Sequence, residues 1–83
     1  MITQQFTAAV NMEARLAALF VQNASKFQSR LLIRRDNMEV NCKSIMGIVS
    51  MSINKGDIVT VTGIGADESE AVKTLMKMLE SRE

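Results

Sequence analysis

Near the start of the chain, the stretch NMEARLAALF places an acid, Glu13, two residues before a base, Arg15. A carboxylate can serve as a general acid or base, but it usually does so beside a second acid, a histidine or a metal ion. The sequence has no histidine, and no second acid stands near Glu13 along the chain. A carboxylate that precedes a helix also interacts well with the helix dipole. Residue types alone therefore favour a dipole-stabilising role for Glu13 over catalysis.

Ser44 is the next residue whose side chain could take part in chemistry, and it stands directly before a short predicted helix. Two interpretations are open. As a helix cap, the serine hydroxyl satisfies a free backbone N–H group and contributes about 1 kcal/mol. As a phosphorylation site, Ser44 would hold its phosphate at the positive end of the helix dipole, where the charge is tolerated without unfolding the domain. Composition does not choose between them.

The helix predicted after Ser44, over 45–52, is apolar on two sides. Its periodicity points Ile48 and Met51 one way and places three further apolar residues on a roughly opposite arc, namely Ile45, Met46 and Val49. A small domain has too little material to bury both sides. Single exposed apolar residues are normal, but three adjoining ones favour a partner-binding surface.

The helix predicted over 14–27 repeats this pattern. Its buried face is formed by Ala17, Phe20, Val21, Ala24 and Phe27. Leu19 lies opposite that face, Leu16 lies at its margin, and Arg15 points away from the core.

These residues must be positioned by a small set of elements. Hydrophobic patterns and turn signals predict strands over 2–8, 30–35, 38–42 and 57–63, with helices over 14–27, 45–52 and after Asp67. The resulting order, βαββαβα, predicts an α+β fold in which a four-stranded antiparallel sheet carries three helices on one face.

Two local details accompany this prediction. Asp67 and Glu70 form a capping-box-like pair at the start of the last helix. Arg30, Arg34 and Arg35 make a small basic cluster on a strand, which indicates either a solvated face or protection of a strand edge.

Length and composition exclude several classes of function. The 83 residues make one domain, 1–83, with no membrane-length hydrophobic run and a net charge of +1, which argues against nucleic acid as the main partner. With Cys42 as the one cysteine and no histidine, zinc sites, other metal sites and disulfides are not expected, and a reducing cytoplasm is favoured. We expect Cys42 to face the core, and we expect no cofactor.

Three stretches carry a resemblance to a known family: EARLAALFVQNASKF, VNCKSIMGIVSMS and KGDIVTVTGIGADESEA. Over essentially its full length the chain resembles HPr, the histidine-containing phosphocarrier of the bacterial sugar phosphotransferase system. The resemblance implies the HPr-like open-faced β-sandwich, which has the element order predicted above.

The resemblance also assigns residues. Glu13 falls at the family's phosphorylatable histidine, with Arg15 matching the arginine that assists it. Leu16 replaces the usual proline and Asn11 the usual glycine. Ser44 matches the serine that HPr kinase/phosphorylase modifies in Gram-positive bacteria. Its hydrophobic neighbours, which contact partner proteins in the family, correspond to Ile45 and Met46, and Val49 stands where a methionine is common.

The departure at Glu13 changes the expected function. HPr carries phosphate on an imidazole nitrogen that glutamate lacks, so relay from enzyme I to a permease is not expected. The chain is similar to the catabolite-repression HPr-like branch, Crh, which lacks the histidine and keeps the serine, although Crh has glutamine at this position. The resemblance implies a cytoplasmic, non-enzymatic regulator phosphorylated on Ser44.

Several partners follow from that resemblance. The phosphorylated protein would bind a LacI-type catabolite-control repressor through Arg15, Leu16, Leu19, Ile45, Met46 and Val49, without contacting nucleic acid or membrane itself. The alternative is an HPr-type component that binds enzyme I as a competitor or atypical phosphocarrier. A third interpretation is a diverged paralogue that keeps the fold and binds something unrelated.

Overall fold

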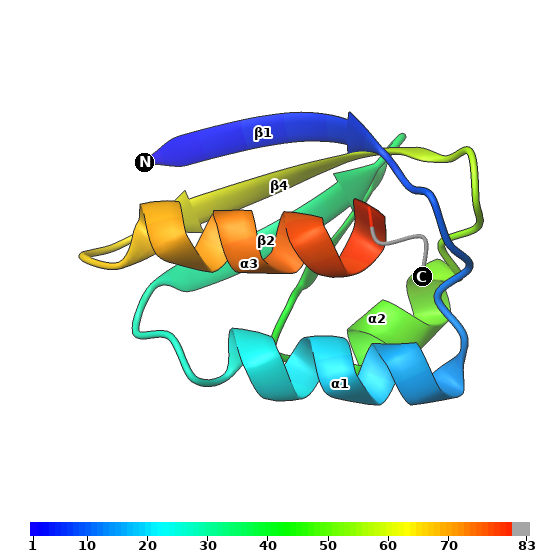
Figure 1. Ribbon diagram of the computed structural model, residues 1–83, viewed down its shortest axis with the longest axis horizontal. Coiled ribbons are helices and arrows are strands. Elements are labelled where there is room, and N and C mark those ends of the chain that lie inside the picture. Colours follow the sequence, from blue (N-terminus) through cyan, green and yellow to red (C-terminus); the bar gives the residue numbers. More distant parts are fainter. Residues whose placement is uncertain (81–83) are drawn as a thin grey trace.

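The computed structural model describes residues 1–80 as one sheet with helices packed on one of its faces (Figure 1). In chain order the elements are β1 (Ile2–Thr7), α1 (Ala14–Ala24), β2 (Arg30–Arg35), β3 (Met38–Asn41), α2 (Ile45–Met51), β4 (Ile58–Ile64) and α3 (Glu68–Glu80). The predicted βαββαβα order and α+β class are confirmed. The last residues of the predicted domain, 81–83, lie outside the described part.

The sheet has the strand order β1-β4-β2-β3, with every neighbouring pair antiparallel. Strands β1 and β3 are therefore its edges, and β2 lies inside. This excludes the proposed role of the β2 arginines in protecting a strand edge. Arg30 and Arg34 are exposed, whereas the half-buried Arg35 pairs with Asp57.

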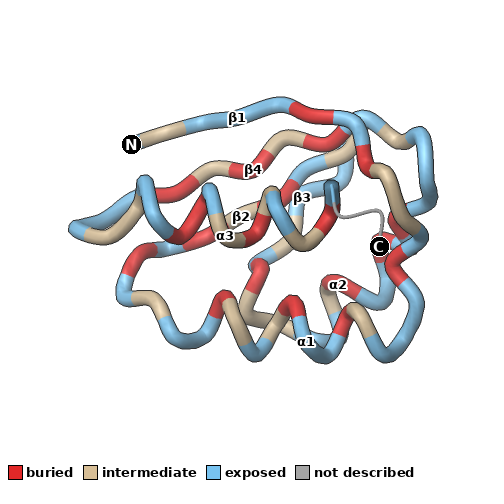
Figure 2. The backbone as a smooth tube through the Cα atoms, viewed as in Figure 1, coloured by how far each residue is buried: buried red, intermediate tan, exposed pale blue. Residues whose placement is uncertain are grey.

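The core lies between the sheet and the helices (Figure 2). Each strand contributes alternate residues to it, because side chains alternate between the two faces of a sheet. The fully buried contributors from β2 and β4 are Leu31, Ile33, Val59 and Val61, and α3 contributes its predicted stripe of Ala71, Val72, Leu75 and Leu79. Burying each large side chain is worth about 1.5–3 kcal/mol. The other sheet face is left open, as predicted.

Helix α1 ends three residues before the predicted boundary, at Ala24 rather than at residue 27. After it the backbone tightens: Lys26 donates to the carbonyl of Asn23, and Phe27 to that of Ala24. These bonds span three residues instead of four, which turns the chain out of the helix. Phe27 still packs against the core from this turn.

The predicted capping box at α3 is wrong. The backbone carbonyl of Asp67 does accept from Ala71 as the helix begins, at 3.0 Å. Its carboxylate, however, accepts from the backbone N–H groups of Gln28 and Ser29, at 2.9 and 3.0 Å, and from the Ser29 hydroxyl. Glu70 takes part in none of the side-chain hydrogen bonds within residues 1–80. The Asp67 side chain therefore bonds to the loop before β2 and forms no local capping box with Glu70.

Candidate functional site

The segment that leads into α1 is fixed to the loop that follows α2. The buried Met12 donates its backbone N–H to the carbonyl of Ile53 at 2.8 Å. One residue earlier, the side-chain carbonyl of Asn11 accepts from the backbone N–H of Lys55 at 2.7 Å. Two hydrogen bonds, one of them to the Asn11 side chain, thus hold the chain immediately before Glu13 against the loop that follows α2.

Glu13 itself occupies the cap position of α1, but its side chain does not cap the helix. Its backbone is extended, with φ −83° and ψ 172°, and its carbonyl accepts from Ala17 at 2.8 Å. No acidic residue lies in the first turn. Neither Glu13 nor the exposed Arg15 forms an ion pair among the described residues. The start of α1 therefore presents a carboxylate and a guanidinium to solvent beside backbone N–H groups that no side chain caps.

Ser44 caps α2, which confirms the structural half of its two interpretations. Its hydroxyl accepts from the backbone N–H of Gly47 at 3.2 Å. Gly47 allows a close approach here, because a Cβ at this position would lie 3.0 Å from the Cβ of Val40. This close approach seats α2 on β3 and leaves Ser44 half-buried at the helix mouth.

The predicted apolar surface is present. We define the α1–α2 face as Arg15, Leu16, Leu19, Ile45, Met46 and Val49. Its exposed fractions are 45 % for Leu19, 42 % for Ile45, 75 % for Met46 and 50 % for Val49. The two helices pack against each other (Figure 1), so both parts of the face lie on the same side of the molecule. Leu16 is half-buried and packs against the core, and therefore contributes less than the others.

The opposite side of α2 is anchored as predicted. Ile48 and Met51 are completely buried, so burial of this side orients Met46 and Val49 toward solvent. Immediately after Met51, Ser52 adopts a left-handed conformation with φ 51°, which ends the helix.

Sequence reasoning missed the ion pair that holds the end of α2. The Arg35 guanidinium contacts the Asp57 carboxylate at 3.0 Å and also donates to the carbonyl of Ser52 at 3.1 Å. The same carboxylate accepts from the backbone N–H of Asn54 at 2.8 Å. The sequence did contain a sign of this ion pair: Arg35 stands two residues after Ile33 in β2, so both side chains point to the core face of the sheet.

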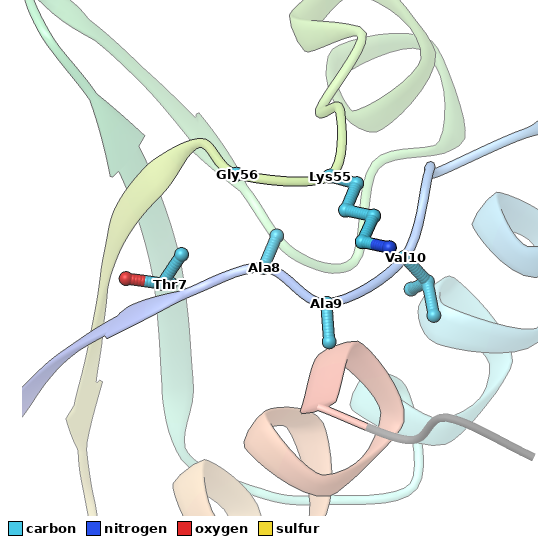
Figure 3. A pocket seen from close by; sticks show the side chains of 6 residues that line it. All are labelled: Thr7, Ala8, Ala9, Val10, Lys55 and Gly56. Carbon is cyan, nitrogen blue, oxygen red and sulfur yellow. The ribbon is translucent and has the colours of Figure 1, made fainter.

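A hollow of about 610 Å³ lies beside the segment that leads into α1. Among residues 1–80, Lys55 is the one charged residue that lines it, and the others are Thr7, Ala8, Ala9, Val10 and Gly56. Figure 3 shows the Lys55 side chain extending toward Val10. A cation therefore lies near the entry to α1, and among the described lining residues Thr7 is the one that carries a hydroxyl, with no acid or thiol beside it.

The remaining reactive group is hidden. Cys42 is fully buried, as predicted, and burial raises the pKa of its thiol to about 12, against a smaller opposing effect of Lys43. A thiol with such a pKa is not a nucleophile near neutral pH. Within residues 1–80, no three His, Cys, Asp or Glu side chains are placed to hold a metal ion, and no helix is long and apolar enough to cross a membrane.

Comparison with known proteins extends this picture. Residues 3–81 match the family model described as "PTS HPr component phosphorylation site". The chain is 45 % identical over 69 residues to the HPr-like protein Crh of Halalkalibacterium halodurans, covering 83 % of this chain and 82 % of that protein.

Two solved structures are also similar. The phosphocarrier protein HPr of Bacillus anthracis is 37 % identical with a TM-score of 0.91, covering 95 % of this chain and 96 % of that one. Crh of Bacillus subtilis, a catabolite repression protein solved as a domain-swapped dimer, is 38 % identical with a TM-score of 0.77, covering 94 % and 90 %.

Proposed function

The chain belongs to the HPr family, and we propose that it is a regulator of the Crh type, switched by phosphorylation of Ser44. The observation that carries this proposal is the position of Ser44, which begins a helix whose exposed side is apolar. In this proposal the protein catalyses no reaction, takes no cofactor and acts in the cytoplasm, where its buried free Cys42 stays reduced.

The proposed switch is a change of charge at Ser44. HPr kinase/phosphorylase transfers the γ-phosphoryl group of ATP to the Ser44 hydroxyl oxygen, and ADP and the hydroxyl proton are released. The phosphoserine carries a charge of about −1.5 to −2 at neutral pH. Its oxygens can keep accepting from the Gly47 N–H that the hydroxyl now uses, so α2 retains its cap. The new charge lies immediately beside Ile45 and Met46.

The proposed partner is a LacI-type catabolite-control repressor that binds the α1–α2 face. Met46 and Val49 would supply the buried apolar contact, and the phosphate would supply a charge that is present only after modification. Arg15 would add a polar contact at the margin. Glu13 has no imidazole nitrogen, so the family's phosphoramidate cannot form at this position.

Phosphorylation is tested by incubating the purified protein with HPr kinase/phosphorylase and ATP and measuring the intact mass. We expect a single phosphoryl group, which Ser44→Ala abolishes. Ser50→Ala is the matched control, since Ser50 lies exposed on the same helix without capping it. No modification, or modification that survives Ser44→Ala, contradicts the proposal.

Repressor binding is tested separately by titrating the phosphorylated protein into the repressor. Met46→Ala should weaken binding about tenfold, because it removes the most exposed apolar side chain of the face. Ile58→Ala is the control, since Ile58 is similarly exposed, at 57 %, but lies on β4. Equal effects of the two substitutions would exclude the α1–α2 face as the binding surface.

The alternative function is favoured by one observation: Glu13 and Arg15 are exposed and unpaired among the described residues, at the start of α1. An HPr-type component could present them to enzyme I, either as a competitor or as an atypical carrier that forms an acyl phosphate on Glu13. Labelling with phosphoenolpyruvate and enzyme I tests this. Label that disappears in Glu13→Ala would establish a carrier, whereas enzyme I inhibition without label would indicate a competitor.

A further inference from the structure

A second candidate surface lies in the groove between β1 and α3, away from the α1–α2 face (Figure 1). The groove measures about 430 Å³. Strand β1 contributes Ile2 and Gln4, and α3 contributes Val72, Lys73, Met76 and Lys77. The buried Val72 and half-buried Met76 form an apolar floor, and the two exposed lysines stand above it.

Strand β1 offers unpaired backbone groups along this groove. Within residues 1–80 it pairs with β4 alone and is an edge of the sheet, so alternate residues direct their N–H and C=O groups away from the sheet. Its even-numbered residues face the helices, as the buried Phe6 shows. A strand added at this edge would alternate in the same way and point every second side chain toward the floor of the groove.

The two walls are already held together. At one end the terminal amino group of Met1 contacts the Glu68 carboxylate at 3.1 Å, and at the other the Ala9 N–H donates to the carbonyl of Leu79 at 2.9 Å. Each contact joins the β1 segment to α3. A groove fixed at both ends loses little conformational freedom when it is occupied, which favours binding.

The positive charge of two lysines indicates what kind of segment the groove between β1 and α3 binds. Lys73 and Lys77 lie one helical turn apart on the same side of α3, and neither forms an ion pair within residues 1–80. Of the described residues that line the groove, Glu80 is the one acid, so the two lysines leave this lining with a net positive charge. We propose that the groove binds an extended acidic segment of a partner protein, which adds to β1 as a further strand with apolar side chains on the floor and carboxylates at the lysines.

This binding does not depend on phosphorylation of Ser44. Strand β1 and α2 lie at opposite sides of the molecule in Figure 1, so one copy can hold a partner at each surface. The protein would then join the acidic segment to whatever occupies the α1–α2 face.

The probe for this proposal is a synthetic ten-residue peptide that alternates valine and glutamate, titrated into the full chain and followed by backbone amide NMR shifts. We expect shifts confined to β1 and α3. The double variant Lys73→Gln, Lys77→Gln should weaken binding about five- to tenfold, as expected for the loss of two exposed ion pairs. Met46→Ala is the matched control and should leave peptide affinity unchanged.

Two further peptides separate strand addition from simple charge attraction. A peptide alternating valine and lysine should not bind, and one N-methylated on alternate residues, which cannot pair its backbone, should lose most of its affinity. No binding at about 1 mM peptide, shifts on α1 and α2 instead, or unchanged binding of the methylated peptide would each overturn the proposal. So would concentration-dependent shifts of the β1 amides without peptide, because a second copy would then be the occupant.

Discussion

Two helices of this protein begin beside an acid, and the two acids have opposite surroundings. Glu13 precedes α1 and is exposed, and its side chain caps nothing. Asp67 precedes α3 and accepts hydrogen bonds from the Ser29 hydroxyl and from the backbone N–H groups of Gln28 and Ser29. The Ser29 hydroxyl first, and the Gln28 N–H next, hold the pKa of Asp67 below its usual range.

The difference shows how a carboxylate is committed to stability or left available for binding. The oxygens of Asp67 join the loop before β2 to the start of α3, so this carboxylate stabilises the fold. Glu68 is committed in the same way: the Gly65 N–H, and then the terminal amino group, lower its pKa. The Glu13 carboxylate forms no side-chain cap or ion pair among the described residues, so its charge is available to a partner.

The largest loss of stability is expected from a substitution at Gly65, which precedes α3. Gly65 has φ +150°, and a Cβ there would lie 2.6 Å from the Ser29 hydroxyl oxygen and 2.8 Å from the Ser29 Cα. Gly65→Ala should therefore cost about 3 kcal/mol of unfolding free energy, measured by urea denaturation. Gly56→Ala is the control: its φ is +98° with no atom within 4 Å of the new Cβ, and it should cost about 1 kcal/mol. Equal losses would mean that the contact with Ser29 is unimportant.

Ser29→Ala removes one partner of Asp67 and should cost about 1 kcal/mol, because Ser29 is buried and its hydroxyl bonds a charged acceptor. Thermal melting followed by circular dichroism measures the effect. The exposed Ser25, at the end of α1, provides the control Ser25→Ala. A Ser29→Ala protein as stable as the control would contradict the importance of this hydrogen bond.

Acid pH should weaken the start of α3 selectively. The pKa values of Asp67 and Glu68 are lower in the folded than in the unfolded chain, so their stabilisation is fully present above about pH 5. It is lost as the pH falls through the lowered folded pKa values. Unfolding measured from pH 6 to pH 2 should show a smaller loss of stability for Asp67→Asn than for the parent chain. Parallel curves would show that Asp67 contributes nothing to the acid dependence.

Glu13→Gln should have the smallest effect on stability, within about 0.5 kcal/mol, since it removes only the interaction with the helix dipole. The same denaturation assay, run beside Gly65→Ala, measures it. A loss of more than about 1 kcal/mol would show that Glu13 is committed to the fold like Asp67, and would remove the contrast between the two helices.

Sequence patterns predicted much of the fold and of the site. The strand and helix order, the two sides of α2 and the cap at Ser44 depend on residues within one or two turns of each other, which local periodicity can detect. The predicted end of α1 was wrong because tertiary contacts decide where this helix ends. The chain leaves the helix early, and the backbone N–H groups of Gln28 and Ser29 then donate to the Asp67 carboxylate. Helix propensity contains no information about a partner so distant in the chain.

The order of the amino acids is enough to show which residues alternate between core and solvent, because hydrophobic spacing is a property of residues close together in the chain. It thereby placed Met46 and Val49 on an exposed surface and Ser44 at a helix mouth. The tertiary structure alone decided that β1 is an edge beside α3, that Arg35 anchors α2 through Asp57, and that Asp67 is bonded while Glu13 is not. Each of these depends on segments far apart in sequence meeting in space, and only the assembled sheet brings them together.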